Sequence, residues 1–141
     1  MTITRAEARD TITTALRGID GLTVYPGTIP DRVPTYSTGV IRPYVGVWVT
    51  NSTDDPWSRS LSTLTDADTI RIRIQTQVVA ATDAMVYDVA DRVSAVLTNL
   101  PVGVHWVTPD TDQQAGAYIL TDTGTTPARP YLPLSWQLTT Q

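Results

Sequence analysis

Several residue types are missing or rare in this sequence. It contains no cysteine, lysine or phenylalanine, a single histidine (His105) and a single glutamate (Glu7). Without cysteine, the chain can form neither a disulfide framework nor a thiolate metal site. A GC-rich genome would produce the remaining bias through codon usage, and we attach no function to it.

Long apolar runs and an excess of positive charge are also absent. No stretch approaches the roughly 20 apolar residues that a membrane span needs, and the N-terminal residues lack the apolar core of a secretory signal. The net charge of −4 argues against a protein whose main task is to grip a nucleic-acid backbone. We therefore expect a cytosolic chain with no membrane contact.

The composition is otherwise that of an ordinary globular protein. The chain has 141 residues, of which 41% are hydrophobic and 17% charged. This length suits one domain, residues 1–141, that buries about two thirds of its unfolded surface. The sequence shows no internal repeat and no low-complexity tract.

Two segments have the apolar spacing of a helix. Thr4 and Glu7 form a capping box that predicts the start of the first helix. Gly18 or Gly21 ends this helix. Thr82 or Asp83 caps the second helix, and Pro101 stops it. Its apolar stripe consists of Met85, Val86, Val89, Ala90, Val93, Val96, Leu97 and Leu100. Both helices are amphipathic and are expected to lie on a core.

The remaining regular segments have the two-residue alternation of strands. We expect strands over residues 22–25, 44–50, 69–81, 102–108, 117–121 and 131–140. Long polar or Pro/Gly-rich connections cover residues 26–43 and 51–68. Strands that follow one another without crossover helices favour antiparallel pairing, and Pro133 suggests that the last strand begins at a sheet edge.

These elements predict an α+β fold. It contains a mostly antiparallel sheet of about five to six strands, with two amphipathic helices packed on one face and long polar loops. The other face carries a polar row in the strand 69–81. The members of this row alternate with isoleucines and are Arg71, Arg73, Gln75 and Gln77. Such a row meets water, another subunit or a ligand.

Enzyme motifs are scarce. His105 has no partner carboxylate or nucleophile in a recognisable motif, so a catalytic triad cannot be argued. Acid pairs at Asp54, Asp66 and Asp110 lack the glycine and terminal glutamate of a calcium loop, and we interpret them as solvated loop acids. We expect no enzyme activity, no cofactor and no metal.

Features typical of protein contacts are better represented. Trp57 is the one large aromatic residue of a polar connection, where it either anchors a partner or folds back onto its own domain. The candidate subunit or partner contacts are Arg32, Tyr36, Trp57, Arg59, Arg71, Arg73, Gln75 and Gln77. The two long connections flank one strand, so they emerge at opposite ends of it and suit different neighbours.

The order of parts resembles the tail terminator proteins of long-tailed bacteriophages. The resemblance covers most of the chain and is carried by four segments. They are 24-VYPGTIPDRVPTY-36, 43-PYVGVWV-49, 71-RIRIQTQVVAATDAMVYDVADRVSAVL-97 and 131-YLPLSWQLT-139. Both long connections are extended relative to the family, so no loop residue is carried over from relatives.

The resemblance implies a structural virion protein. Such proteins form a hexameric ring on the head-proximal end of the tail tube, stop its polymerisation and provide the surface for head joining. The implied partners are other copies of the chain, the tail tube protein and head–tail connector proteins. Genomic DNA passes through the lumen without specific binding. The polar row from Arg71 to Gln77 then becomes either the lumen wall or a subunit contact.

Three other interpretations remain open. The chain is another ring-forming head–tail connector or neck protein, a tail tube subunit, or a small hydrolase or ligand-binding domain. The tube is disfavoured because two well-formed helices are unusual in so short a tube protein. A deep pocket lined by His105 and paired acids would favour the ligand-binding domain.

Overall fold

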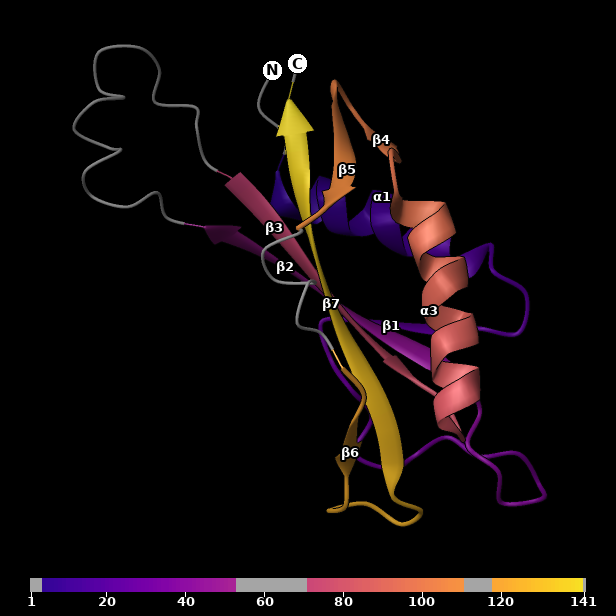
Figure 1. Cartoon of the computed structure of the whole chain (residues 1–141). Helices are drawn as coiled ribbons and strands as arrows, with labels where there is room; N and C mark the ends of the chain where they lie inside the picture. Colours follow the sequence, from indigo (N-terminus) through magenta and orange to yellow (C-terminus); the bar gives the residue numbers. More distant parts are fainter. Residues whose placement is uncertain (1–3, 53–70, 111–117, 141) are drawn as a thin grey trace.

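The computed structural model describes residues 4–52, 71–110 and 118–140. Figure 1 shows an α+β fold in which a strongly twisted sheet is accompanied by two helices. The elements are α1 (Arg5–Arg17), β1 (Thr23–Pro26), β2 (Tyr44–Ser52), β3 (Arg71–Val79), α3 (Asp83–Leu97), β4 (Pro101–Val102), β5 (His105–Pro109), β6 (Leu120–Asp122) and β7 (Arg129–Thr140).

Helix α1 begins at the predicted capping box. The Thr4 hydroxyl accepts from the Glu7 N–H at 3.1 Å, and the Glu7 carboxylate accepts from the Thr4 N–H at 3.3 Å. These two bonds satisfy N–H groups that have no partner within the helix. The buried side of α1 consists of Ala8, Ile12, Thr13 and Leu16, so the predicted amphipathic character of this helix is confirmed.

Helix α3 starts as predicted but ends early. The Thr82 hydroxyl accepts from the Met85 N–H at 3.2 Å and caps the start. The last helical residue is Leu97, and Thr98 already has extended backbone angles. The expectation that Pro101 stops the helix was therefore wrong. Asn99 has a φ of +64°, and this left-handed residue turns the chain before the proline is reached.

The sheet is mixed, with the order β1-β2-β3-β7-β5-β4 and with β6 also paired to β7. All pairs are antiparallel except β1 with β2. The prediction of a mostly antiparallel sheet is confirmed, but the expected antiparallel pairing of the first two strands was wrong. Parallel neighbours need a long connection between them, and residues 27–43 supply it.

The predicted strand 102–108 is a short hairpin, and it raises the strand count to seven. Gly103 has a φ of +64°, which separates β4 from β5. Val102 then pairs with His105 across the turn. The local pattern of alternating apolar residues did not reveal this reversal, because a tight turn at one glycine leaves the alternation almost intact.

Strand β7 lies in the middle of the sheet, so the edge position predicted from Pro133 was wrong. One side of β7 pairs with β3, while the other pairs with β6 up to Tyr131 and with β5 from Trp136 onward. The Ser135 carbonyl accepts from the Asp110 N–H on the β5 side. Backbone polar groups two residues apart point to the same side of a strand, so the ring nitrogen of Pro133 points to the same side as the Ser135 carbonyl. On that side it faces the gap between β6 and β5, where no N–H donor is needed.

The main core contains side chains from both helices and from the apolar parity of the strands. Ala8 and Leu16 of α1 belong to the same buried cluster as Val86 and Val93 of α3. The largest member, Trp136, is fully buried. Its indole N–H donates to the Thr76 hydroxyl at 3.1 Å, and that hydroxyl donates to the Leu134 carbonyl at 3.3 Å. These two bonds pair the polar groups of Trp136 and Thr76 inside the apolar core.

No helix in residues 4–52, 71–110 or 118–140 has the length and apolar character needed to cross a bilayer.

Candidate interaction surface

The second face of the sheet carries the polar row of β3. Ile74 and Thr76 are buried, whereas Arg73 and Gln75 are exposed. The alternation expected for a strand with one buried face is therefore confirmed over these residues. Gln77, further along the strand, is half-buried, so the row becomes covered toward the C-terminal end of β3.

Two rows across β2, β3 and β7 form the open end of this face. In the first row, Arg73 lies between Thr50 of β2 and Gln137 of β7. The second row consists of Trp48, Gln75 and Ser135. Directly opposite residues on one face have Cβ atoms about 5 Å apart, so these polar groups act together. We call Thr50, Arg73, Gln75, Ser135 and Gln137 the open end.

A polar hollow of about 200 Å³ lies within the open end. It is lined by Thr50, Arg73, Ile74, Gln75, Asp110, Ser135 and Trp136. The Asp110 N–H donates to the Ser135 carbonyl at 3.0 Å, which holds Asp110 against β7. An acid, an arginine, an amide and hydroxyl groups thus meet in one depression.

Asp110 was interpreted from the sequence as a solvated loop acid, and this was wrong. The residue is only 7% exposed. It directly follows β5, and the ladder between β5 and β7 carries it onto the sheet. A polar run after a strand does not reveal which of its first residues continues the ladder.

The other end of the same face is covered by the connection between β1 and β2. A second small core contains Val33 and Ile41 of this connection together with Tyr44 and Val79 of the sheet. The rings of Tyr25 and Tyr44 meet edge to face, with centroids 5.5 Å apart. We call the sheet residues Tyr44, Val79 and Tyr131, which belong to this second core or pack against it, the covered end.

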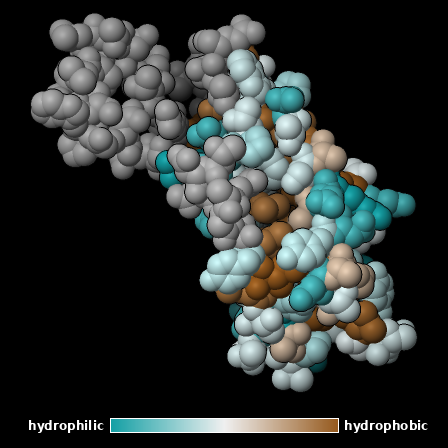
Figure 2. Space-filling view, viewed as in Figure 1, coloured by the Kyte–Doolittle hydropathy of each residue, from teal (hydrophilic) through white to brown (hydrophobic). Residues whose placement is uncertain are grey.

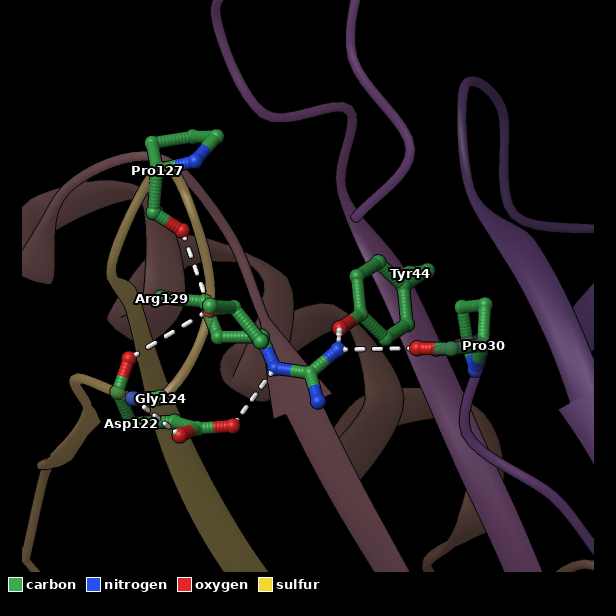
Figure 3. Close-up of polar contacts among 7 residues, drawn as sticks. Pro30, Tyr44, Asp122, Gly124, Pro127 and Arg129 are labelled. Atoms are coloured by element: carbon green, nitrogen blue, oxygen red, sulfur yellow. Dashed lines mark hydrogen bonds and ion pairs between the residues drawn. The ribbon is translucent and has the colours of Figure 1, made fainter. Parts of the chain in front are cut away.

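Arg129 ties the covered end together (Figure 3). Its Nε donates to the Asp122 carboxylate at 3.0 Å. Its Nη1 donates to the Pro30 carbonyl at 3.1 Å and to the Tyr44 hydroxyl at 2.7 Å. One planar guanidinium therefore joins the β6–β7 turn, the long connection and the first residue of β2. The Arg129 side chain is only 12% exposed.

The Asp122 carboxylate also organises the β6–β7 turn. It accepts from the Gly124 N–H at 3.0 Å, while the Thr125 hydroxyl donates to the Pro127 carbonyl at 3.0 Å (Figure 3). These bonds are typical of a turn in which an aspartate replaces a backbone partner. The turn therefore presents the carboxylate to Arg129 in a defined position.

The ionisation of this network follows its contacts. The hydrogen bond from Arg129, helped by the N–H of Gly124, lowers the pKa of Asp122 below its ordinary value of 3.8. Burial raises the pKa of Tyr44, although the charge of Arg129 opposes the rise. Burial acts to lower the pKa of Arg129, but the hydrogen bond to Asp122 and the contacts with Tyr44 outweigh it, so the net change is upward.

The connection also forms a small projecting hairpin over residues 34–42. Its backbone bonds run from the Tyr36 N–H to the Val40 carbonyl at 2.8 Å and from the Arg42 N–H to the Pro34 carbonyl at 2.9 Å. The Arg42 guanidinium carbon lies 5.6 Å from the centroid of the Tyr36 ring. Tyr36 and Val40 are nearly half exposed. The hairpin therefore displays an aromatic, an aliphatic and a cationic group in a fixed arrangement.

The structure brings only some of the predicted contact residues together. Arg73 and Gln75 lie together at the open end, and Arg32 and Tyr36 are exposed on the β1–β2 connection. Arg71 begins β3, and only its backbone is described. Trp57 and Arg59 lie outside the described residues.

His105 does not line the polar hollow. It is half-buried at the start of β5, and its Nδ1 is buried without a hydrogen-bond partner in the described part of the chain. Within those same residues, no cluster of three His, Asp or Glu side chains is suited to a metal ion. The hollow contributes polar recognition groups.

Sequence reasoning missed Asp110 and Arg129. Arg129 falls between the predicted strands 117–121 and 131–140, but it opens β7 and pairs with Asp122 at the end of β6. The spacing of an acid and an arginine around a Pro/Gly turn was the available signal for a hairpin closed by an ion pair. Asp110 had no such signal.

A comparison with protein-family models gave no match to this chain, and a comparison with curated proteins gave none either.

Proposed function

We propose that this chain is a structural virion protein, a tail terminator that caps the head-proximal end of a phage tail tube. In this proposal six copies form a ring, stop tube polymerisation and present the surface for head joining. The tail tube protein and head–tail connector proteins are its partners, and it resides in the virion after assembly in the host cytoplasm. No reaction is catalysed and no cofactor takes part.

The observation that carries the proposal is the division of one sheet face into two dissimilar surfaces. The polar open end, with Arg73, lies at one end of the β2–β3 ladder. The connection that carries the Tyr36 hairpin covers the other end. A subunit that meets unlike neighbours on different sides needs such a pair of dissimilar surfaces, because a heterologous interface joins two different patches.

The arrangement of the helices belongs to the same proposal. We propose that α1 and α3 cover the face of the sheet opposite Arg73, so that the polar face stays available for assembly. The shared core of both helices with Ile74 and Val47 supports this placement. Arg73 has the opposite parity on β3, and it is exposed.

A tube-capping experiment tests the function. Purified chain is added to polymerising tail tube protein from the same phage, and tube lengths and the position of gold-labelled chain are recorded by electron microscopy. We expect growth to stop, with label at one end only. Label along the whole tube would indicate a tube subunit, and unchanged growth would contradict the terminator.

The same assay tests each of the two long connections as a tube contact. A Tyr36→Ala/Val40→Ala variant removes the apolar tip of the hairpin, whereas Trp57→Ala removes the aromatic residue of the second connection. Loss of capping with either variant assigns the tube contact to that segment. A head–tail connector would instead bind capped tails and leave the length distribution unchanged.

A further inference from the structure

Helix α3 displays an acidic stripe with one aromatic residue at its centre. Asp83, Tyr87 and Asp91 are spaced by four residues, so they lie on one side of the helix. All three are exposed, and Tyr87 is 54% exposed. Figure 2 shows hydrophilic side chains on the outer side of α3. We call these three residues the α3 stripe.

The two acids of the α3 stripe have no cationic partner among the described residues. The other acid on the exposed side, Asp88, pairs with Arg92 at 3.3 Å. That pair leaves Asp83 and Asp91 as two net negative charges on either side of Tyr87. A tyrosine with an apolar ring and a polar tip is a common anchor at the centre of protein interfaces.

The polar hollow has the size and the groups to receive this anchor. Its volume is about 200 Å³, and a cavity of about 150 Å³ accommodates benzene. The buried Asp110 carboxylate lines it and can accept a hydrogen bond from a phenol O–H. The exposed Arg73 also lines it, and its guanidinium suits a carboxylate that flanks the aromatic ring.

The α3 stripe and the polar hollow cannot meet within one chain. Val86 and Val93 of α3 pack into the core with Ile74 of β3. Arg73 and Gln75 have the alternate parity and therefore point to the other face of the sheet. The stripe lies on the side of α3 that faces away from this core, so the two surfaces face in different directions. They meet only between two copies.

We propose that Tyr87 of one copy inserts into the polar hollow of the next copy. In that contact its hydroxyl donates to Asp110 of the neighbour, and Asp83 and Asp91 are attracted by Arg73 of the neighbour. This inference deepens the proposed function and rests on it, since it names the subunit interface of the ring.

The charges favour this head-to-tail contact over a two-fold contact. Two α3 stripes placed against each other would bring four carboxylates together, and like charges in an interface are repelled. A stripe against a hollow pairs opposite charges. Because the two patches differ, the contact is heterologous, and its repetition closes into a ring when the rotation between copies allows it.

Cysteine cross-linking tests the contact directly, because the chain contains no cysteine. Thr50→Cys is at the rim of the hollow, and Ala84→Cys is on the exposed side of α3. Under oxidation, the double variant should give a ladder of disulfide-linked oligomers. Each single variant should stay monomeric on a denaturing gel, while a mixture of the two should give only dimers. Thr50→Cys with Ala6→Cys, an exposed alanine of α1, is the matched control and should give no ladder.

A charge reversal provides the second test. Arg73→Glu should reduce the yield of the ladder by roughly tenfold, which corresponds to about 1.4 kcal/mol. Asp83→Arg/Asp91→Arg should do the same, and the combination of all three changes should restore the ladder. Asp20→Arg reverses an exposed acid that belongs to neither surface and should have no effect.

All samples are prepared alone and with assembled tail tubes, and sedimentation gives their oligomeric state. A ring by sedimentation, without a cross-link between positions 50 and 84 in either sample, overturns this interface and leaves the terminator proposal intact. Cross-links between two copies of position 84 show a two-fold contact and also overturn it. A monomer in both samples that fails to cap tubes contradicts the terminator itself.

Discussion

The two ends of one sheet face differ in what covers them, although they are made by the same strands. At the covered end, Tyr44 and Val79 are fully buried beneath the β1–β2 connection. At the open end, Thr50 and Arg73 are exposed. On this face, β2 and β3 therefore each have buried side chains at one end and exposed side chains at the other. Residue type alone does not decide burial on this face. Tyr44 is fully buried at the covered end, whereas Trp48, also aromatic, is only half-buried between the two ends.

The β1–β2 connection acts as a third layer of the molecule at the covered end only. It contributes Val33 and Ile41 to a second core, and Arg129 holds its Pro30 carbonyl. The hairpin with Tyr36 is thereby carried on a fixed base. At the open end, no segment within residues 4–52, 71–110 and 118–140 contributes such a core.

The two ends should differ most in the free energy of unfolding that is lost when one β2 side chain is truncated at each end. Tyr44→Ala should lower the free energy of unfolding by about 3–5 kcal/mol, because it removes a fully buried aromatic side chain and the acceptor of an Arg129 hydrogen bond. Thr50→Ala, on the same face of β2, should change it by less than about 0.5 kcal/mol. Urea denaturation followed by circular dichroism measures both. Equal losses would remove the distinction between the ends.

The next effect compares the two arginines. Arg129→Met should lower the free energy of unfolding by about 2 kcal/mol, since it leaves the Tyr44 hydroxyl and the Pro30 carbonyl without their donor. Arg73→Met should leave it nearly unchanged, because that guanidinium is exposed. If Arg73→Met destabilised the isolated chain as strongly, its role would be structural and the proposed contact would lose its basis.

A smaller effect is expected at Gly46, between the two ends. A Cβ at this position would lie 2.6 Å from the Cη2 atom of the Trp48 ring, so Gly46→Ala should cost about 1 kcal/mol as the ring shifts. In a Trp48→Ala background the same substitution should cost less, because the obstructing ring is gone. The double-mutant cycle measures this coupling. Additive losses would show that the ring does not oppose the added methyl group.

The smallest effect concerns acid stability at the covered end. The folded-state pKa of Asp122 is lowered, so the folded chain binds fewer protons than the unfolded chain just below pH 3.8. The contribution of Asp122 is therefore present above pH 3.8 and is lost as the pH falls through the folded-state pKa. Asp122→Asn should destabilise at neutral pH and should approach the parent chain in acid. A difference that stays constant down to pH 2 would contradict this linkage.

Part of this fold was predictable because its signals are local. The capping box at Thr4 and Glu7 satisfies the helix N-terminus with residues three positions apart, so it can be recognised without tertiary information. The alternation around Ile74 and Arg73 also needs only the geometry of a strand. The early end of α3 at Leu97 was missed because Asn99 took a left-handed conformation that many asparagines do not adopt.

The candidate site was predictable only in part. The exposure of Arg73 and Gln75 follows from alternation, whereas the partners around them depend on register. Asp110 reaches the hollow through the pairing of β5 with β7, which brings distant segments together. The same dependence explains Pro133, whose central position is possible because β6 and β5 leave a gap beside it.

The sequence by itself determined the two helices, the parity of β3 and the polar character of its exposed row, because hydrophobic periodicity and capping act over a few residues. Only the tertiary structure decided that one half of the polar face is covered and the other half is hollowed. That division depends on where a long connection packs, on which strands become neighbours and on the reach of one arginine, Arg129, between segments far apart in the chain. Contacts of this kind arise from the packing of the whole chain, so a local pattern carries no record of them.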